Sequence, residues 1–397
     1  MPSNKPAIHW LGAGLASGPG LISLVNKWGE ANVWSSEINR PRKLLSKVNE
    51  GATLNVHSLA LEDNNSVEIF RNALRAGDII ISMLPATLHI QVANIAIDEN
   101  CHLVTSSYIN EEMRNLNGVA SAKGLSLVNE VGLDPGIDHL LTHVLIDEAR
   151  KANVLDQGNK LDFVSYCGGF PVEETPFTYK FSWTPLGVLS ALTNPAQFIK
   201  NGKETETPTA WEAVSEFSIH NEVFEAYANR NSLPFIAEYG LDSESNLRTF
   251  VRGTLRKAGW KHAWKDIFSA LVNISSDDLG LLSDKLWKEH QYNKGEQDRV
   301  LLYVALTSTS VSGETWKGSL TLDEKGNGWQ SAMASTVSYT VAQAVNALME
   351  GRLSPGVQAA PDDVVEAKLW LRGLAGNGIK IKKVNVEKAG REASQKH

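Results

Sequence analysis

The chain has 397 residues, of which 42% are hydrophobic and 21% charged, and its formal net charge is −7. This length predicts two or three domains, and the mildly acidic balance argues against nucleic acid or an anionic membrane as the main partner. The two cysteines lie far apart in the sequence and cannot make a disulfide framework. This cysteine usage predicts a reduced, cytoplasmic compartment. The polar N-terminus predicts no secretory signal, and no apolar run reaches the length of a membrane span.

The first third of the chain alternates short apolar segments with amphipathic ones. The stretch 78–84 is nearly all apolar, which is typical of a central parallel strand covered on both faces. Alternation of strands and helices predicts an α/β fold with a doubly wound parallel sheet. We expect its strands at 7–11, 32–35, 53–57, 78–84, 102–106 and 125–129.

The alternation stops after Gly136, where Ile137 begins a predicted amphipathic helix. The pattern then indicates a mixed α+β domain, with 168–185 loop-like because of its glycines and prolines. We expect the tail, with helices at 333–349 and 362–373 and an alternating segment at 379–386, to pack back on the first domain. The predicted domains are 1–132 completed by 333–397, and 133–332. Within the second, extended segments are expected at 161–167, 216–227, 248–255, 300–309 and 317–322, and helices at 264–272 and 279–290.

A short glycine motif, Gly12-x-Gly14, follows the first predicted strand and precedes a helix. In this context it predicts dinucleotide binding, because the first glycine permits a tight turn and the second lets a pyrophosphate approach backbone N–H groups. Ser17 takes the place of the third glycine of the full fingerprint, and a plain strand–helix turn is the alternative.

Glu37 lies just past the second predicted strand, where an acid can accept hydrogen bonds from the ribose hydroxyls of NAD and repel the 2′-phosphate of NADP. Ser35 and Glu37 are therefore candidate cofactor residues, and NAD is the predicted cofactor. NADP remains the alternative, because hydroxyl and guanidinium groups that could hold its phosphate stand nearby at Ser35, Ser36, Arg40 and Arg42.

The segment from Asn129 to His139 follows the last strand of the predicted sheet and holds the break Asp134-Pro135-Gly136. Ligand sites favour the carboxyl ends of parallel strands and domain boundaries, so we expect chemistry here. The simpler interpretation is a helix start with Asp134 as N-cap. His139 is expected to be structural, and the Cys and His positions show no metal-ligand spacing.

Two arginines, Arg230 and Arg252, are candidates to bind a substrate carboxylate, because the guanidinium fork suits bidentate contact. Surface salt bridging is the ordinary alternative for each. Tyr108 and Cys167 are, on residue type alone, more often a half-buried aromatic and an inert small residue than reactive groups.

Several longer blocks go beyond residue types, and they span most of the chain in family order. The blocks are 105–108 (TSSY), 129–139 (NEVGLDPGIDH), 165–171 (SYCGGFP), 179–183 (YKFSW) and 251–256 (VRGTLR). They resemble the glutamate-forming saccharopine dehydrogenases.

This resemblance implies oxidation of L-saccharopine to L-glutamate and 2-aminoadipate 6-semialdehyde with a nicotinamide cofactor. It also implies a Rossmann domain completed by the C-terminal segment, an inserted substrate-binding and dimerisation domain, and a homodimer. The positions that match the family's substrate residues are Ser107, Tyr108, Asp134, Arg230 and Thr254, with Cys167 close by. Those that match its cofactor residues are Gly12, Ala13, Gly14, Leu15, Ala16, the end of the second strand, Leu84, Pro85 and Trp183.

One departure from the biosynthetic, NADP-using members stands after the second strand, where this chain has Ser36-Glu37 in place of an arginine. Its Ser-Ser-Glu resembles the NAD-using halves of bifunctional lysine-degrading enzymes, which favours NAD and the catabolic direction. Asp134 is the candidate acid or base, with Tyr108 and Cys167 as polar neighbours. In the alternative, Asp134 only orients the amine and solvent moves the protons.

Rival functions are a related oxidoreductase, such as lysine 6-dehydrogenase or carboxynorspermidine synthase, or a nucleotide-sensing module without catalysis. The SYCGGFP block argues against the first group. The combination of Tyr108, Asp134 and Arg230 argues against the second.

Overall fold

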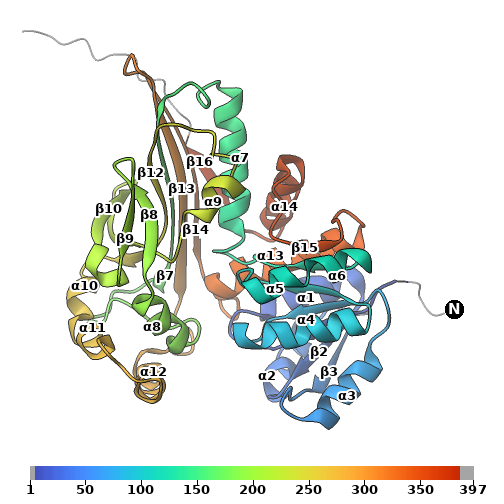
Figure 1. Ribbon diagram of the computed structural model, residues 1–397. Coiled ribbons are helices and arrows are strands. Elements are labelled where there is room, and N and C mark those ends of the chain that lie inside the picture. Colours follow the sequence, from blue (N-terminus) through green and yellow to red (C-terminus); the bar gives the residue numbers. More distant parts are fainter. Residues whose placement is uncertain (1–4, 385–397) are drawn as a thin grey trace, which may run out of the picture. The chain divides into compact units, whose positions relative to one another are not determined.

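The computed structural model describes residues 5–384. These residues form two compact units, whose elements are labelled in Figure 1. Unit 1 holds the described residues up to Leu140 together with Met333–Pro361 and Val365–Ile379. Unit 2 holds Leu141–Ala332, Asp362–Val364 and the described residues from Lys380 on.

Unit 1 is built on a parallel sheet of seven strands in the order β15-β6-β5-β4-β1-β2-β3. All neighbours in it pair in parallel, which confirms the doubly wound sheet predicted from the alternating pattern. The strands are β1 (Ile8–Leu11), β2 (Glu30–Ser35), β3 (Thr53–Ser58), β4 (Ile79–Ser82), β5 (His102–Thr105), β6 (Ser126–Val128) and β15 (Gly356–Gln358). The helices are α1 (Gly18–Trp28), α2 (Asn39–Arg42), α3 (Asn64–Ala73), α4 (His89–Asp98), α5 (Glu111–Asn115), α6 (Asn117–Ala122), α13 (Ala332–Met349) and α14 (Val364–Gly376), with single 3₁₀ turns at Leu45–Lys47 and Ala86–Leu88.

One hydrophobic cluster joins the sheet of unit 1 to helices α3 to α6. It contains Phe70 of α3, Val92 of α4 and Met113 of α5, packed on sheet residues such as Ile80 and Leu103. In Figure 1, α4, α5 and α6 lie side by side in front of the sheet. Helices on the faces of a parallel sheet explain why β4 is buried along its whole length.

Helices α1 and α13 also approach each other closely. The backbone N–H of Gly20 donates to Ser338 Oγ at 2.7 Å, and a Cβ on Gly20 would lie 2.0 Å from the Ser338 carbonyl oxygen. The indole of Trp28 donates to Asn346 Oδ1 at 2.8 Å. Part of the C-terminal segment thus completes unit 1, through α13, β15 and α14.

Unit 2 contains a mixed sheet in the order β10-β11-β12-β7-β13-β14-β16, with the hairpin of β8 and β9 attached to β12. Only the β12–β7 pair is parallel among the pairs described. The strands are β7 (Lys160–Pro171), β8 (Ala196–Lys200), β9 (Lys203–Thr207), β10 (Ser215–Ile219), β11 (Glu222–Ala228), β12 (Leu247–Lys257), β13 (Asp298–Thr309), β14 (Thr315–Lys325) and β16 (Ile381–Val384). The helices are α7 (Ile137–Lys151, whose residues up to Leu140 belong to unit 1), α8 (Pro185–Thr193), α9 (Pro234–Glu238), α10 (Trp260–Ala263), α11 (Lys265–Leu271) and α12 (Ser276–His290), with a 3₁₀ turn at Ala210–Ala213.

The structure corrects the sequence prediction at β7, which continues to Pro171 and so includes the first residues of the segment expected to be a loop. Gly168 lies within this strand. The position requires glycine because a Cβ there would lie 2.6 Å from the Leu255 carbonyl oxygen on β12. The glycine therefore marks a close approach of two strands, not a turn. The segment predicted as one extended piece at 216–227 is a hairpin of β10 and β11, turned at His220 with φ +54°. The hairpin of β8 and β9 and helix α8 were not predicted.

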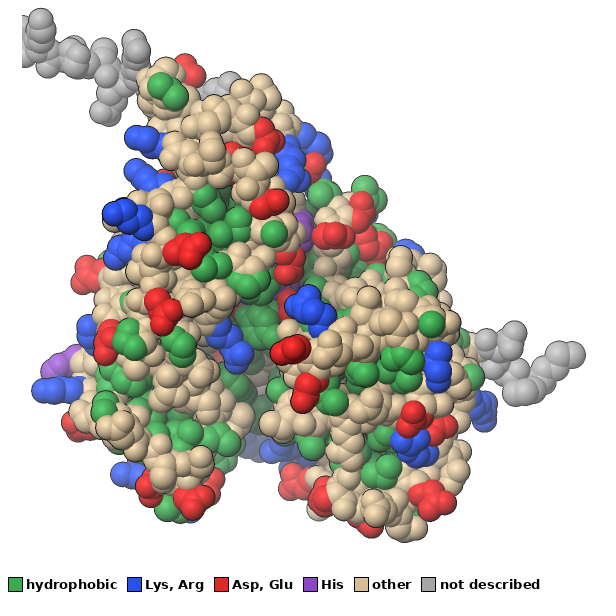
Figure 2. Space-filling view, in the orientation of Figure 1, with side chains coloured by type: hydrophobic (Ala, Val, Ile, Leu, Met, Phe, Trp, Pro, Cys, Tyr) green, Lys and Arg blue, Asp and Glu red, His purple; other side chains and the backbone are tan. Residues whose placement is uncertain are grey.

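The prediction that the whole tail packs on the first domain is wrong for β16. This strand pairs antiparallel with β14 in the sheet of unit 2, with Ser319 opposite Val384. The last residues of the predicted alternating segment lie outside the described residues. No helix in the described part of the chain is long and apolar enough to cross a membrane. Acidic and basic side chains are interspersed over the face shown in Figure 2, in keeping with the small net charge.

Candidate functional site

The turn between β1 and α1 requires a glycine at its first position. Gly12 has φ +90°, and a Cβ there would lie 2.9 Å from the Met83 carbonyl oxygen at the end of β4. Ser17, in place of the third glycine, is buried and donates its hydroxyl to the Gly12 carbonyl at 3.0 Å. A Cβ on Gly14 would meet no atom within 4 Å, so the backbone there faces open space.

A pocket of about 270 Å³ opens beside this turn, at the carboxyl ends of β1, β2 and β4. Of the predicted cofactor residues, Leu15 and Ala16 do not line it, and Trp183 belongs to unit 2. The others line this one pocket: Gly12, Ala13, Gly14, Ser35, Glu37, Leu84 and Pro85. The carboxyl edge of a parallel sheet beside a glycine turn is where nucleotides bind in doubly wound folds.

The segments after β2 and β3 contribute the charged groups of this pocket. Glu37 and Glu62 supply two carboxylates and Arg40 one guanidinium, and all three side chains are exposed. Ser35 Oγ accepts from the Glu37 backbone N–H at 3.2 Å, so this hydroxyl holds the loop that presents the acid. Arg42, the other arginine of the loop, is not among the lining residues.

Further along the same sheet edge, the loops after β5 and β6 bring two predicted substrate residues together. The Tyr108 hydroxyl donates to Asp134 Oδ1 at 3.0 Å. Ser107, next to Tyr108 in the chain, is likewise only partly buried. The structure therefore unites Ser107, Tyr108 and Asp134 in unit 1.

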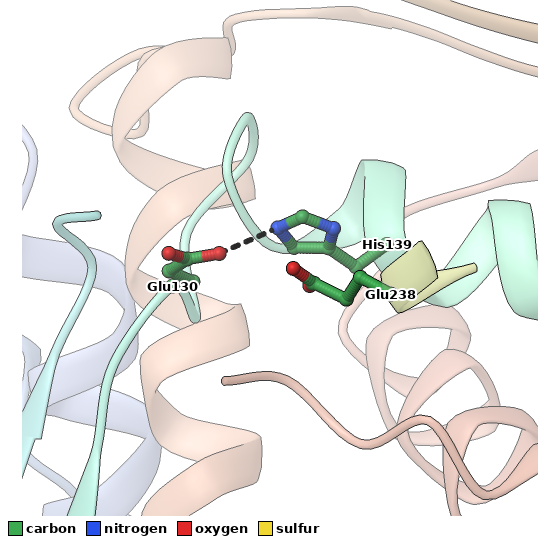
Figure 3. Close-up of side chains that lie close together, drawn as sticks. All are labelled: Glu130, His139 and Glu238. Atoms are coloured by element: carbon green, nitrogen blue, oxygen red, sulfur yellow. Dashed lines mark ion pairs between the residues drawn. The ribbon is translucent and has the colours of Figure 1, made fainter. Parts of the chain in front are cut away.

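Glu130 holds these two loops to each other. Its backbone N–H donates to the Ser107 carbonyl at 3.0 Å, and its Oε1 accepts from the Ile109 N–H at 2.9 Å. Its other carboxylate oxygen, Oε2, pairs with His139 Nε2 at 2.9 Å, the contact drawn as a dashed line in Figure 3. Because both side chains are almost fully buried, this arrangement fixes the backbone on either side of Tyr108.

The helix after this motif begins at Ile137, where the amphipathic pattern predicts it, and the alternative interpretation with Asp134 as its N-cap is wrong. Instead the Asp138 carboxylate accepts from the Gly136 N–H at 2.7 Å, and the Ile137 N–H donates to the Gly132 carbonyl at 3.0 Å. The Asp134 carboxylate contacts Tyr108 in place of a helix end.

A histidine that the sequence prediction passed over, His89, also belongs to this edge. It is the first residue of α4 and is almost fully buried, and its imidazole contacts hydroxyls of Ser82, Thr105 and Ser107. Burial lowers the pKa of His89 to about 4, so the ring is neutral near pH 7. Its position shortly after Leu84-Pro85 was the one signal the sequence offered.

The remaining predicted residues lie in unit 2, on β7, β12 and nearby loops. Cys167 and Thr254 are direct neighbours across the β7–β12 pair, so their side chains share a face of the sheet. Arg252 shares that face, two residues along β12, but its guanidinium is buried and its central carbon lies 3.8 Å from the centre of the Phe235 ring. Arg230, in contrast, is exposed, and has φ +57° in the turn after β11.

Trp183, predicted to serve the cofactor, lies against helix α8. A Cβ on Gly187 would lie 2.3 Å from its ring, so the glycine makes room for the indole. The side chain remains 41% exposed, which leaves part of its surface available to a ligand.

Family models match both parts of the chain. The model described as "Saccharopine dehydrogenase NADP binding domain" matches residues 8–128, and the one described as "Saccharopine dehydrogenase C-terminal domain" matches residues 132–379. The chain belongs to the saccharopine dehydrogenase family. The resemblance seen in the sequence motifs is therefore confirmed.

Similar proteins from other organisms agree with this membership. A saccharopine dehydrogenase [NADP(+), L-glutamate-forming] of Pyricularia oryzae is 29% identical, over 89% of this chain and 93% of that protein. A mitochondrial alpha-aminoadipic semialdehyde synthase of Rattus norvegicus is also 29% identical, but the chain covers only 45% of its length. The solved structure of the apo saccharopine dehydrogenase (L-Glu forming) of Saccharomyces cerevisiae matches with a TM-score of 0.75 and 26% identity, covering 96% of this chain and all of that one.

Proposed function

We propose that this protein is a glutamate-forming saccharopine dehydrogenase. It oxidises L-saccharopine to L-glutamate and 2-aminoadipate 6-semialdehyde with a nicotinamide dinucleotide, and serves lysine metabolism, in the direction of degradation. Family membership and the names of the relatives support an oxidoreductase. The observation that carries the proposal is the Tyr108–Asp134 hydrogen bond, at the sheet edge that also forms the nucleotide pocket.

The residues of the pocket fit a dinucleotide. The open space at Gly14 leaves room for a pyrophosphate beside backbone N–H groups, and the tight turn at Gly12 brings the start of α1 toward it. When bound, the nicotinamide supplies the hydride acceptor for oxidation of a C–N bond. Leu84 and Pro85, at the end of β4, line the same pocket and would flank the cofactor.

Asp134 is the residue we assign to proton transfer at the secondary amine of saccharopine. Loss of hydride from carbon gives an imine, water adds to it, and the resulting carbinolamine breaks its C–N bond to release glutamate and the aldehyde. Each step moves a proton, and a carboxylate held in place by Tyr108 can accept and return it. Cys167, beside Thr254 in unit 2, is assigned as a polar neighbour of the substrate.

Binding of saccharopine requires hydrogen-bond donors for its carboxylates. Ser107, Arg230 and Thr254 are the residues we assign to them, and Trp183 is assigned to the cofactor. Arg252 is assigned a supporting role, because its guanidinium is buried on the Phe235 ring. We further propose that unit 2 is the substrate-binding and dimerisation domain of a homodimer.

The pocket residues also bear on the choice between NAD and NADP as the cofactor. The name of the family model and that of the Pyricularia relative point to NADP. The pocket is lined by two carboxylates, Glu37 and Glu62, and by one guanidinium, Arg40. A 2′-phosphate would add negative charge beside the carboxylates. On this balance we propose a preference for NAD.

The test is reduction of the nicotinamide on addition of L-saccharopine, with NAD and NADP in parallel assays. Reduction mainly with NAD supports both the substrate and the role of Glu37. Reduction mainly with NADP supports saccharopine as the substrate and overturns the proposed preference for NAD. Absence of reduction with either cofactor overturns the proposed function, and substrates of lysine 6-dehydrogenase and carboxynorspermidine synthase would then be tried.

A further inference from the structure

The imidazole of His89 stands among three hydroxyl groups at the carboxyl ends of β4 and β5. Its Nδ1 lies 2.9 Å from Ser82 Oγ. Its Nε2 lies 2.8 Å from Ser107 Oγ and 3.0 Å from Thr105 Oγ1. Thr105 Oγ1 also accepts from the Ser107 backbone N–H at 3.3 Å, so two side chains converge on Ser107.

This group is built into the core of unit 1. Ser82 and Thr105 are fully buried and are neighbours across the β4–β5 pair, and His89 is 5% exposed. Ser107 alone is partly exposed, where it can meet a ligand. A buried network that ends in one accessible hydroxyl holds that hydroxyl in a defined direction.

We propose that His89 is a positioning residue, which orients the Ser107 hydroxyl toward the substrate. The inference rests on the proposed function, in which Ser107 contacts saccharopine. His89 itself touches neither the substrate nor the cofactor in this proposal, and acts through Ser107.

The chemistry of a neutral imidazole explains the orientation. Such a ring has one N–H donor and one lone pair, so it either accepts the Ser107 O–H or donates to the Ser107 oxygen. A serine hydroxyl on its own rotates freely, and fixing its orientation before the substrate arrives reduces the entropic cost of binding. With one side of Ser107 bonded to His89, its remaining donor or acceptor is directed away from the core.

Two amide variants separate the contacts of His89. His89→Gln places an amide at the distance of Nε2, and can restore the bond to Ser107. His89→Asn places its amide at the distance of Nδ1, and can restore only the bond to Ser82. We expect His89→Asn to lower kcat/KM for saccharopine about 10- to 100-fold, and His89→Gln to lower it by about fivefold at most.

The effect should depend on Ser107. In a Ser107→Ala background, His89→Asn should change kcat/KM by less than about twofold, because its partner is already absent. The dissociation constant of the cofactor, followed by fluorescence, should stay near the wild-type value in all these variants. Should His89→Asn fail to fold, Ser82→Ala takes its place, because it removes the Nδ1 contact alone and is expected to leave kcat/KM nearly unchanged.

The outcomes are distinct. The positioning role would be overturned if His89→Gln and His89→Asn lowered kcat/KM equally, or if Ser82→Ala lowered kcat/KM as much as His89→Asn. It would also be overturned if the effects of His89→Asn and Ser107→Ala on kcat/KM multiplied in the double variant. If the wild-type protein does not oxidise saccharopine with either cofactor, it is the proposed function that fails.

Discussion

The Glu130 carboxylate and the His139 imidazole form a buried ion pair, with 2.9 Å between Oε2 and Nε2. Glu130 joins the loop after β6 to the loop after β5, since it also bonds the backbone of Ser107 and Ile109. Its position next to the Tyr108–Asp134 contact makes it a support for the proposed site.

Glu130→Ala is expected to destabilise the protein. The substitution removes the buried Glu130–His139 contact together with the hydrogen bond to the Ile109 N–H, and breaking a buried pair of this kind typically costs about 3–5 kcal/mol. Glu130→Gln retains an oxygen for the Ile109 N–H, and should cost about 1–2 kcal/mol. Urea unfolding measures both, and equal losses in the two variants would show that the charge and the hydrogen bond do not act as described.

Asp134→Asn tests the proposed proton transfer. If Asp134 is the acid or base, kcat should fall by about 10²- to 10⁴-fold, and the pH dependence of kcat should lose one limb. Tyr108→Phe, which removes only the donor to Asp134, serves as the milder comparison and should cost about tenfold. A loss of only a few-fold in Asp134→Asn with an unchanged pH profile would leave the carboxylate with an orienting role alone.

Substitutions at the end of β2 should shift cofactor choice. Glu37→Ser removes a carboxylate beside the proposed ribose site, and should raise kcat/KM with NADP relative to NAD on the order of tenfold. Arg40→Ala should lower the activity with NADP more than that with NAD, whereas Arg42→Ala, outside the pocket, is the matched control. A Glu37→Ser enzyme with the wild-type preference would exclude Glu37 as the discriminating residue.

The buried His89 makes stability sensitive to acid. Its pKa is lowered from 6.5 to about 4 by burial, so the unfolded chain binds a proton there that the folded chain does not. The contribution of His89 to stability is therefore complete above about pH 6.5 and is lost as the pH falls toward about 4. Between about pH 7 and pH 5 the loss should be about 2 kcal/mol.

Urea unfolding at these two pH values, for the wild-type protein and for His89→Gln, measures this loss. The variant has no titrating group at the position, so its own decrease in stability should be smaller by that amount. The same decrease in both proteins would assign the acid sensitivity to other groups.

Several features of the fold could be predicted from local patterns. The four buried residues of β4 and the glycine turn at Gly12 are encoded by neighbours in the sequence, and the structure has them as expected. Where glycine serves a close approach of two strands, as at Gly168, the sequence looks the same as a loop. The hairpin of β10 and β11 lacks glycine and proline at its turn, so it could not be told from one long strand.

At the candidate site, the sequence indicated individual residues, whose roles stay predictions, and it indicated few of the contacts between them. Tyr108 and Asp134 meet, as residues at the carboxyl ends of parallel strands can. The contacts of His89 with Ser82 and Thr105 depend on strands that are separate in the sequence, so no local pattern reports them. The burial of Arg252 on Phe235 depends in the same way on helix α9, which is separate from β12 in the sequence.

The pairing of β16 with β14 has a consequence for the making of this protein. β14 is completed along the chain before α13, β15 and α14, but its partner β16 follows them. During synthesis on the ribosome, the backbone N–H and C=O groups that β14 presents to β16 therefore stay unpaired with that strand until the rest of unit 1 has been synthesised. An open strand edge invites pairing with other chains, so a fragment that stops at residue 332 would keep this edge permanently and should aggregate where the longer chain does not.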